Sequence, residues 1–539
     1  MTILSRRPGI QVSRWAPKTA EVAFVFRWLR REFKPVEPRS PGPSQIATLA
    51  ILTLFMLFAF PFSASAQQAQ FDRKAWIKDY EELKTALEQR YSNLAWFASF
   101  QGGVDLPALN KRTMDAFRRA KSDRDARRAI SQFVAGFHGH FSRLEDLEPA
   151  TQTKTPEPPP FTYTPEQPEA GCAALGYASR STTSFSLPFE SLPDFRLIAD
   201  GQEQPLRAGV FTLANHHQVG IIRLSEFETT PYPVFCIKAW KTDVWKDHNQ
   251  LRQGKLEDTI ETAWYETIAG LLSQFKAAGV YAVLVDVGTN YGGDDSGDMA
   301  ARLFTSSPMK SATLLMTQEK SASNPFFDEQ LDELKRAASY KPNATAKALI
   351  DERTNFFTEG QKELSDTCPM DWVWKQRRDW QNEGCRRLHS AGSSGGPLDY
   401  LKPGEIEDIR IARRLHWPAK YTRLWGTWTG AVYVLTDGRT YSSAEMFAAV
   451  LQDNHAAKII GSHSGGSGCG FAEDPPVLTL THSHLRFRMP NCVRLRADGT
   501  DEVAGVQPDI PVLATEGESS RSRALRIMQL IDSDLGSTQ

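Results

Sequence analysis

The feature that most limits how this chain can fold is a strand, a helix and a second strand in close succession. Residues 219–224 form an apolar run typical of a strand, and apolar positions then recur at helical spacing from Ile260 to Phe275. Residues 281–287 are almost continuously apolar, as in a strand that is buried on both faces. Strands joined by a helix in this way lie parallel in one sheet, so the order predicts a crossover unit of an α/β fold.

The same pattern returns towards the C-terminus. Strands are expected at residues 431–435 and 458–461, with a helix at 442–454 between them. The stretch from 306 to 424 is polar and mostly helical in pattern, and it interrupts the alternation. The simplest explanation is an α/β core that is split by a large insertion.

A chain of 539 residues is too long for one compact core, so several domains are expected. A proline-rich stretch at residues 151–168 marks one boundary. The expected organisation is a signal peptide (1–66), an N-terminal helical domain (67–150), a linker with a small β region (151–218), the first part of the core (219–305), the insertion (306–424), the second part of the core (425–515) and a C-terminal helix (516–539).

The N-terminus has the layout of an export signal. An apolar run at residues 46–62 follows several arginines and precedes the small residues Ala64, Ser65 and Ala66. This order predicts cleavage after Ala66. A membrane anchor is the alternative, but Pro61 and the small-residue pattern favour cleavage. We therefore expect a periplasmic or secreted protein without a stable membrane anchor after cleavage.

Six cysteines remain after the predicted cleavage site, and an even number in an exported chain favours disulfides. Pairing of nearest neighbours would join Cys368 to Cys385, Cys469 to Cys492 and Cys172 to Cys236, the first two pairs being favoured. None of the six forms a CxxC pair, so a cysteine zinc site is not expected.

Charge and histidine spacing narrow the function further. The net charge is −1, from 63 basic and 64 acidic residues, which gives no electrostatic footprint for nucleic acid. The histidine pairs 138/140, 216/217 and 482/484 have no glutamate at a metalloprotease-like spacing, so neither a metal nor another cofactor is expected.

Two segments could carry chemistry. The first, DVGTNYGG at residues 286–293, is a glycine-rich turn whose backbone N–H groups could bind a developing oxyanion. The second, residues 440–445, places Ser442 where a strand meets a helix, as a nucleophile requires. Ser442 and Glu445 also fit a capping box, and on this segment alone capping is the simpler interpretation.

Taken together, these segments resemble the C-terminal processing (tail-specific) protease family. The resemblance rests on residues 219–224, DVGTNYGG, the stretch from 432 to 468 and EVAGVQPDIPV at 502–512. It implies a core like the crotonase and Clp-protease folds, peptide or protein substrates and Ser442 as the nucleophile. It further implies that Gly292 and Gly293, with the N–H of Ser443, form the oxyanion hole.

The departures from the family pattern indicate which branch is nearer. The Ser-Lys branch has a lysine where this chain has Ser467, and Arg223 occupies the histidine position of tricorn proteases. The chlamydial protease-like activity factor branch uses serine, histidine and glutamate, and GFHGHF at 136–141 is similar to its histidine segment. That resemblance implies His140 as the base and Glu502 as the third member.

The sequence thus predicts an exported serine peptidase with a Ser-His-Glu triad. The alternative is an inactive member of the fold that binds peptides or apolar ligands in the same cleft. For His140 alone, a partly buried histidine at the end of a helix is the simpler role. Whether the chain forms a homodimer is left open.

Overall fold

The computed structural model describes residues 71–144, 161–179, 183–202, 204–246, 250–317, 325–362, 369–380, 387–472 and 475–537. The predicted signal peptide lies outside these ranges, and so do Cys368 and Cys385. Within these ranges, no helix is both long enough and apolar enough to cross a membrane.

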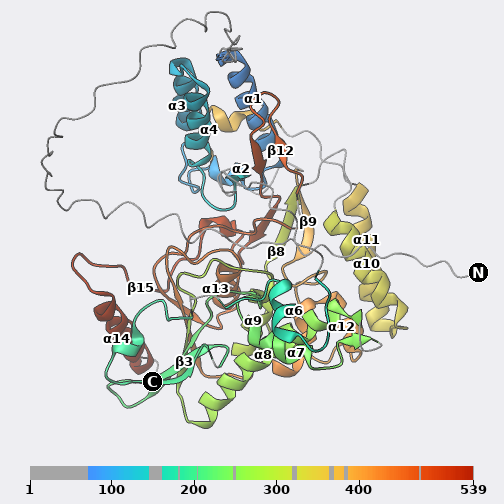
Figure 1. Ribbon diagram of the computed structural model, residues 1–539, viewed down its shortest axis with the longest axis vertical. Coiled ribbons are helices and arrows are strands. Elements are labelled where there is room, and N and C mark those ends of the chain that lie inside the picture. The colour runs from blue at the N-terminus through green and yellow to red at the C-terminus, as the bar shows by residue number, and fades with distance from the viewer. Residues whose placement is uncertain are drawn as a thin grey trace, which may run out of the picture.

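A seven-stranded sheet in the order β15-β11-β10-β7-β4-β3-β2 forms the centre of the fold (Figure 1). Its strands are β2 (Phe195–Asp200), β3 (Arg207–Thr212), β4 (Gln218–Arg223), β7 (Ala282–Asp286), β10 (Ala431–Thr436), β11 (Lys458–Gly461) and β15 (Ile510–Pro511). The strands from β4 to β15 pair in parallel, whereas β2 and β3 are antiparallel at one edge. The strands of the predicted small β region therefore extend the same sheet.

The predicted crossover unit is present. Helix α8 (Gln253–Ala277) connects β4 to its parallel neighbour β7, and every residue of β7 is buried. Gly279 follows α8 with a φ of 74°, a left-handed conformation that suits glycine just after a helix. Helix α13 (Ser443–Asp453) makes the second crossover, from β10 to β11.

The sheet is covered on both faces, which explains its continuous apolar runs. Ile222 and Val283 belong to a core shared with α8 and α13. Their neighbours Ile221 and Leu284 belong to a second core, completed by α14 (Ser520–Ser537). Because successive strand residues point to opposite sides, a sheet with two covered faces needs apolar residues at every position.

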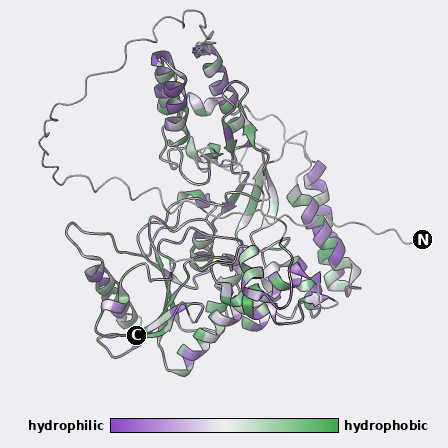
Figure 2. Cartoon of the chain, viewed as in Figure 1, coloured by the Kyte–Doolittle hydropathy of each residue, from purple (hydrophilic) through white to green (hydrophobic). Residues whose placement is uncertain are grey.

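The N-terminal region is helical, as predicted, and lies beside β12 in Figure 1. It consists of α1 (Arg73–Arg90), α2 (Leu94–Phe97), α3 (Leu106–Arg119) and α4 (Asp123–Val134). Figure 2 shows hydrophilic and hydrophobic positions mixed along these helices, as in helices that bury one side. Their buried side shares a core with Leu485, Phe487 and Val503 from the far end of the chain.

Hydrogen bonds also hold this region against the C-terminal part. Asn93 Nδ2 donates to Asp501 Oδ2 at 2.7 Å, and Ser92 Oγ donates to the Cys492 carbonyl at 2.9 Å. Both pairs are buried. The N-terminal helices are therefore packed and bonded onto the strand and loop that carry Glu502.

The insertion is mostly helical, as predicted, but it also contributes two strands. Strands β8 (Thr313–Thr317) and β9 (Leu388–Ser393) form an antiparallel sheet with β14 (Cys492–Leu495). The other described elements of the insertion are α10 (Pro325–Ser339), α11 (Ala344–Lys362), η3 (Asp371–Trp374), α12 (Ile409–Leu415) and η4 (Trp417–Leu424).

Two of the predicted disulfides are present. Cys172–Cys236 joins α6 (Pro168–Ala174) to α7 (Pro233–Trp240), and Cys469–Cys492 joins the loop after β11 to β14. The remaining described elements are β1 (Ser142–Arg143), η1 (Phe189–Ser191), β5 (Trp245–Lys246), β6 (Gln250–Leu251), α9 (Ser296–Ala301), η2 (Arg302–Phe304), β12 (Leu478–Thr479), β13 (Arg486–Arg488) and η5 (Glu502–Ala504).

Candidate active site

Ser442 occupies a strained turn between β10 and α13. Its φ of 54° and ψ of −119° lie in a region that residues with a Cβ rarely adopt, at a cost of about 1–3 kcal/mol. The turn is held from outside, because Tyr441 N–H donates to the Asn290 carbonyl at 2.8 Å. A serine at a strained turn from strand to helix presents its hydroxyl at the edge of the sheet, where a substrate can reach it.

The glycine-rich turn packs directly on this serine. A Cβ added to Gly292, whose φ is 99°, would lie 2.6 Å from Ser442 Cβ and 3.1 Å from its Oγ. Only glycine therefore fits at position 292. The two segments that the sequence singled out are in contact, and the turn lies beside the N-terminus of α13, where backbone N–H groups attract negative charge.

The two glycines of this turn differ as donors. The Gly292 N–H already donates to Asn290 Oδ1 at 2.8 Å, so the expectation that Gly292 supplies an oxyanion donor does not fit this structure. No acceptor for the Gly293 N–H lies among the residues that the structure describes. Gly293 and Ser443, the first residue of α13, thus remain as candidate donors.

Glu445 ties the serine to the loop after β11. The capping-box geometry is present, with Ser442 N–H donating to the Glu445 carboxylate at 3.0 Å. The same carboxylate accepts from Ser464 Oγ at 2.6 Å, Gly466 N–H at 2.6 Å and Ser467 Oγ at 2.6 Å. Burial raises the pKa of Glu445, and the hydrogen bonds from the serines oppose that rise.

The segment with the candidate histidines packs on this loop. His138 Nδ1 lies 2.7 Å from the Gly466 carbonyl, which only accepts, so Nδ1 carries the proton of the neutral ring. His140 lies against Gly470, and its Nε2 is buried without a hydrogen-bond partner among the described residues. This loop also contacts the candidate serine, because Ser467 Oγ accepts from Ser442 N–H at 2.6 Å. The two histidines, which are about 300 residues away from Ser442 in sequence, therefore lie near it in the fold.

Glu502 is fully buried and is paired with a residue that the sequence analysis did not single out. Arg494 donates to Glu502 Oε2 at 2.8 Å and to Oε1 at 2.7 Å. It also donates to the Gly468 carbonyl at 3.0 Å and approaches the Ser442 carbonyl at 3.4 Å. In the described part of the chain, Glu502 pairs with Arg494 and makes no hydrogen bond to His140.

The surroundings of His140 favour the neutral imidazole. Burial, together with the positive charges of Arg494 and Arg488, lowers its pKa to about 4. At neutral pH the ring is therefore uncharged and its unprotonated nitrogen could accept a proton.

The other groups considered for catalysis, a lysine base and a cluster of metal ligands, are not found beside Ser442 in the described part of the chain. Lys458 lies on β11 and pairs with Asp534 at 2.7 Å, so it serves as an ion-pair partner outside this site. In the described part of the chain, no three His, Cys, Asp or Glu side chains are grouped to hold a metal ion. Arg223 is buried and donates to the Gly288 carbonyl at 2.6 Å, which supports the glycine-rich turn.

A serine at a strained strand-to-helix turn of an α/β sheet, with glycine N–H groups beside it, defines the class of serine hydrolases. The model of Peptidase family S41 matches residues 218–512, more than half of the chain. The chain belongs to this family and is a serine peptidase. No curated protein matches it.

The fold is similar to that of one solved structure, mature CPAF, and two others are similar to a lesser degree. Mature CPAF is 14% identical, with a TM-score of 0.51, over 85% of this chain and 96% of that one. A putative peptidase from Parabacteroides merdae is 12% identical, with a TM-score of 0.42 and the same shares covered. The photosystem II D1 C-terminal processing protease is 11% identical, with a TM-score of 0.31, over 84% of this chain and 99% of that one.

Gly292→Ala tests the contact between the turn and the serine. The added methyl group would meet Ser442 Cβ at 2.6 Å and push apart Ser442 and the turn that carries the Gly293 N–H. We therefore expect peptide hydrolysis to fall by at least a hundredfold, as when an oxyanion donor is lost. Gly279→Ala is the matched control, because its φ of 74° gives similar backbone strain but its added Cβ meets nothing within 4 Å. Equal activity of the two variants would contradict the placement.

Arg494→Met tests the buried ion pair. Both side chains are almost inaccessible, at 4% and 0%, so removing the guanidinium leaves an uncompensated buried carboxylate and should lower the free energy of unfolding by about 3–5 kcal/mol. Arg496→Met is the control, since its partner Asp453 is 20% exposed and water can replace the lost charge. Urea unfolding would measure the free energy of unfolding of both variants. An equal decrease in the two would contradict the argument that burial makes the Arg494 pair more important.

Proposed function

We propose that the protein is an exported serine endopeptidase in which Ser442 attacks the peptide carbonyl, His140 is the base and Glu502 is the third member of the triad. The observation that carries the proposal is the strained turn of Ser442, packed against Gly292 at the N-terminus of α13. A strained backbone is costly and persists at sites where it positions a reacting group.

The proposed chemistry begins with proton transfer. His140 takes the proton of Ser442 Oγ as the oxygen attacks the substrate carbonyl, and the N–H groups of Gly293 and Ser443 stabilise the resulting oxyanion. The protonated ring then gives its proton to the leaving amine, and water hydrolyses the acyl-enzyme by the same route. The role of His140 as the base is supported by its Nε2 atom, which is buried and has no other hydrogen-bond partner among the described residues.

The proposal requires the serine, histidine and glutamate to come together in the substrate complex. Catalytic hydrogen bonds are often long in free enzymes and tighten when substrate binds, so the absence of a bond between His140 and Ser442 does not oppose it. Each oxygen of Glu502 accepts from Arg494 and keeps a further lone pair. Glu502 could therefore bind the imidazole without releasing Arg494.

Export to the periplasm or beyond the cell is the second part of the proposal. Two disulfides support it, because such bonds persist in oxidising compartments. The apolar run at residues 46–62 and the small residues after it supply the matching signal. The proposed substrates are peptides or proteins, as for other serine peptidases.

An inactive, peptide-binding protein is the rival function, and labelling distinguishes the two. A serine-reactive phosphonate should label Ser442 in the full chain, because only an activated serine reacts at a useful rate. Absence of labelling, together with peptide binding, would favour the rival.

Loss of Ser442 and of His140 should be non-additive. Ser442→Ala and His140→Ala should each reduce peptide hydrolysis by a factor on the order of a million, and the double variant should resemble either one, because proton transfer fails in each case. His138→Ala is the matched control, as its Nδ1 is held by the Gly466 carbonyl. An inactive His138 variant beside an active His140 variant would move the base to His138.

The pH dependence of hydrolysis should reflect the environment of His140. Its pKa is lowered to about 4, so the proton acceptor is lost only as the pH falls through that value. We expect kcat/KM to rise through a single ionisation near pH 4 and to stay level to pH 7. An inflection at the ordinary histidine value of about 6.5 would show that the active base is outside this environment.

A further inference from the structure

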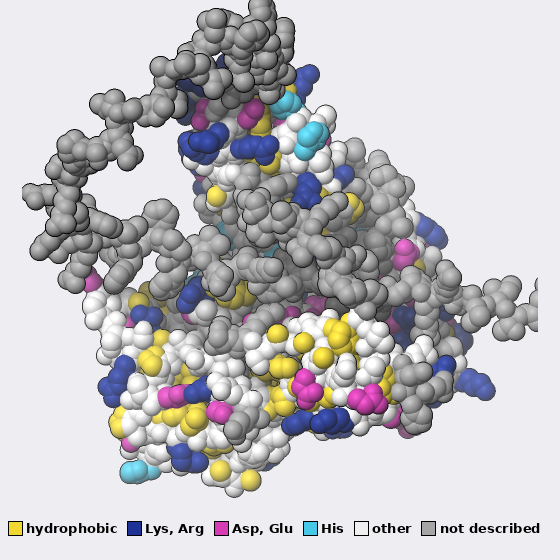
Figure 3. Space-filling view, in the orientation of Figure 1, with side chains coloured by type: hydrophobic (Ala, Val, Ile, Leu, Met, Phe, Trp, Pro, Cys, Tyr) yellow, Lys and Arg dark blue, Asp and Glu magenta, His cyan; other side chains and the backbone are white. Residues whose placement is uncertain are grey.

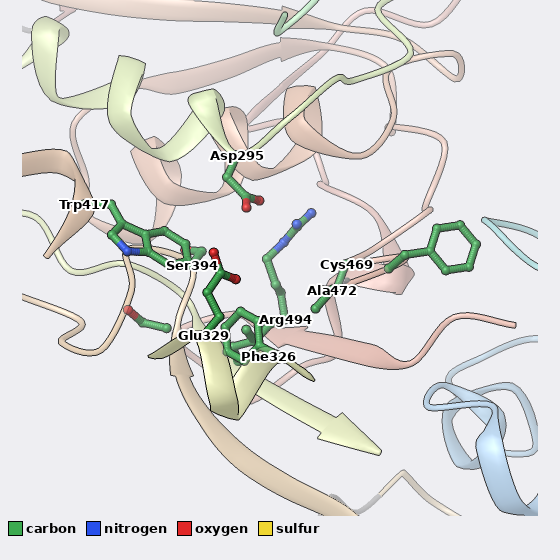
Figure 4. Close-up of a pocket in the computed structure, with 11 residues that line it drawn as sticks. Asp295, Phe326, Glu329, Ser394, Trp417, Cys469, Ala472 and Arg494 are labelled. Atoms are coloured by element: carbon green, nitrogen blue, oxygen red, sulfur yellow. The ribbon is translucent and has the colours of Figure 1, made fainter. Parts of the chain in front are cut away.

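A cavity of about 270 Å³ opens beside the site, between the glycine-rich turn and the insertion (Figure 4). This volume is near the lower end of the range of small-molecule sites, roughly 300 Å³, and suits one side chain better than a longer segment. Leu314, Phe326, Trp417 and Phe471 provide apolar walls, while Asp295, Glu329 and Arg494 provide charge.

The cavity is adjacent to the nucleophile. Arg494 lines it and also lies 3.4 Å from the Ser442 carbonyl. Asp295 follows Gly293 by two residues, so their Cα atoms are at most about 7 Å apart. A peptide bound with its carbonyl at the Gly293 N–H would therefore place a neighbouring side chain at the mouth of the cavity.

The positive charge of Arg494 is already compensated. Both oxygens of Glu502 accept from its guanidinium, and the Gly468 carbonyl accepts from it as well. The Asp295 carboxylate, in contrast, accepts no hydrogen bond from any residue that the structure describes, and Figure 4 shows it directed at the cavity. The net charge that a ligand meets is therefore negative.

The surroundings of Asp295 strengthen this bias. A cation that entered the cavity would stabilise the ionised carboxylate, whereas an anion would be repelled by Asp295. Acidic and basic side chains are intermixed over the lower part of the face shown in Figure 3, so this local excess is not part of a wider acidic surface there.

We propose that this cavity binds a lysine or arginine side chain of the peptide substrate, next to the bond that is cleaved. The aliphatic stem would pack on Phe326 and Trp417, and the cationic head would pair with Asp295. This inference rests on the proposed function for the identity of the ligand as a peptide. A neutral apolar side chain or the substrate's terminal carboxylate, facing Arg494, are the competing occupants.

Binding to the full-length Ser442→Ala variant tests the inference without requiring turnover. The probes are acetyl-Ala-Ala-Xaa-Ala-Ala-amide peptides in which Xaa is lysine, norleucine or glutamate, with the affinity measured by calorimetry. Lysine and norleucine differ mainly in the charged head. We expect the lysine peptide to bind on the order of tenfold more tightly than the norleucine peptide, and the glutamate peptide to bind most weakly.

Asp295→Asn, in the same background, should abolish the preference for lysine over norleucine. Asp294→Asn is the matched control, because Asp294 is the adjacent carboxylate, accepts from Ser296 N–H at 2.9 Å and does not line the cavity. Its preference should be unchanged. Equal affinity for lysine and norleucine in the Ser442→Ala background, or a preference that survives Asp295→Asn, would overturn the inference.

The outcomes separate this inference from the proposed function. A lysine preference that depends on Asp295, without phosphonate labelling of Ser442 in the native chain, would support the proposed cavity ligand and contradict the proposed catalytic role of Ser442. Labelling of Ser442 without a lysine preference would support the catalytic role and contradict the cavity ligand. Tighter binding of a peptide with a free C-terminal carboxylate than of its amide would assign the cavity to that carboxylate instead.

Discussion

The buried carboxylate of Glu445 is the interaction on which the rest of the site depends. It accepts from the backbone of Ser442 on one side and from Ser464, Gly466 and Ser467 on the other. A buried charge is costly unless hydrogen bonds compensate it, and here they come from two separate segments. The same bonds that stabilise the carboxylate therefore hold Ser442 in a fixed position relative to the loop after β11, on which the histidine segment packs.

Much of the fold could be predicted because its signals are periodic. The apolar runs of β4, β7 and β10 identify strands covered on both faces, and the α8 stripe identifies the crossover. The resemblance to the protease family implied that Ser442 lies beside the glycine-rich turn. In the structure both segments follow the carboxyl ends of neighbouring parallel strands. The disulfides Cys469–Cys492 and Cys172–Cys236 agree with the expected pairing of nearest neighbours, although the second pair was the less favoured one.

What could not be predicted depends on long-range contacts without local signals. Arg494 lies on a short strand whose pattern gives no hint that it binds Glu502. The Gly292 N–H is occupied because Asn290 folds back on its own turn, a detail of side-chain conformation. The cavity beside Asp295 could not be predicted, because Phe326 and Trp417, which close it, belong to the insertion and are distant from Asp295 in sequence.

The distances in sequence between the contacting segments have a consequence for synthesis. The bond from His138 to Gly466 spans 328 residues, and the bond from Asn93 to Asp501 spans 408. Contacts of this kind form late, because a long stretch of chain must be ordered before they stabilise anything. A chain still emerging from the ribosome therefore lacks the loop that holds the turn of Ser442, so the site is assembled only after nearly all of the protein has been made.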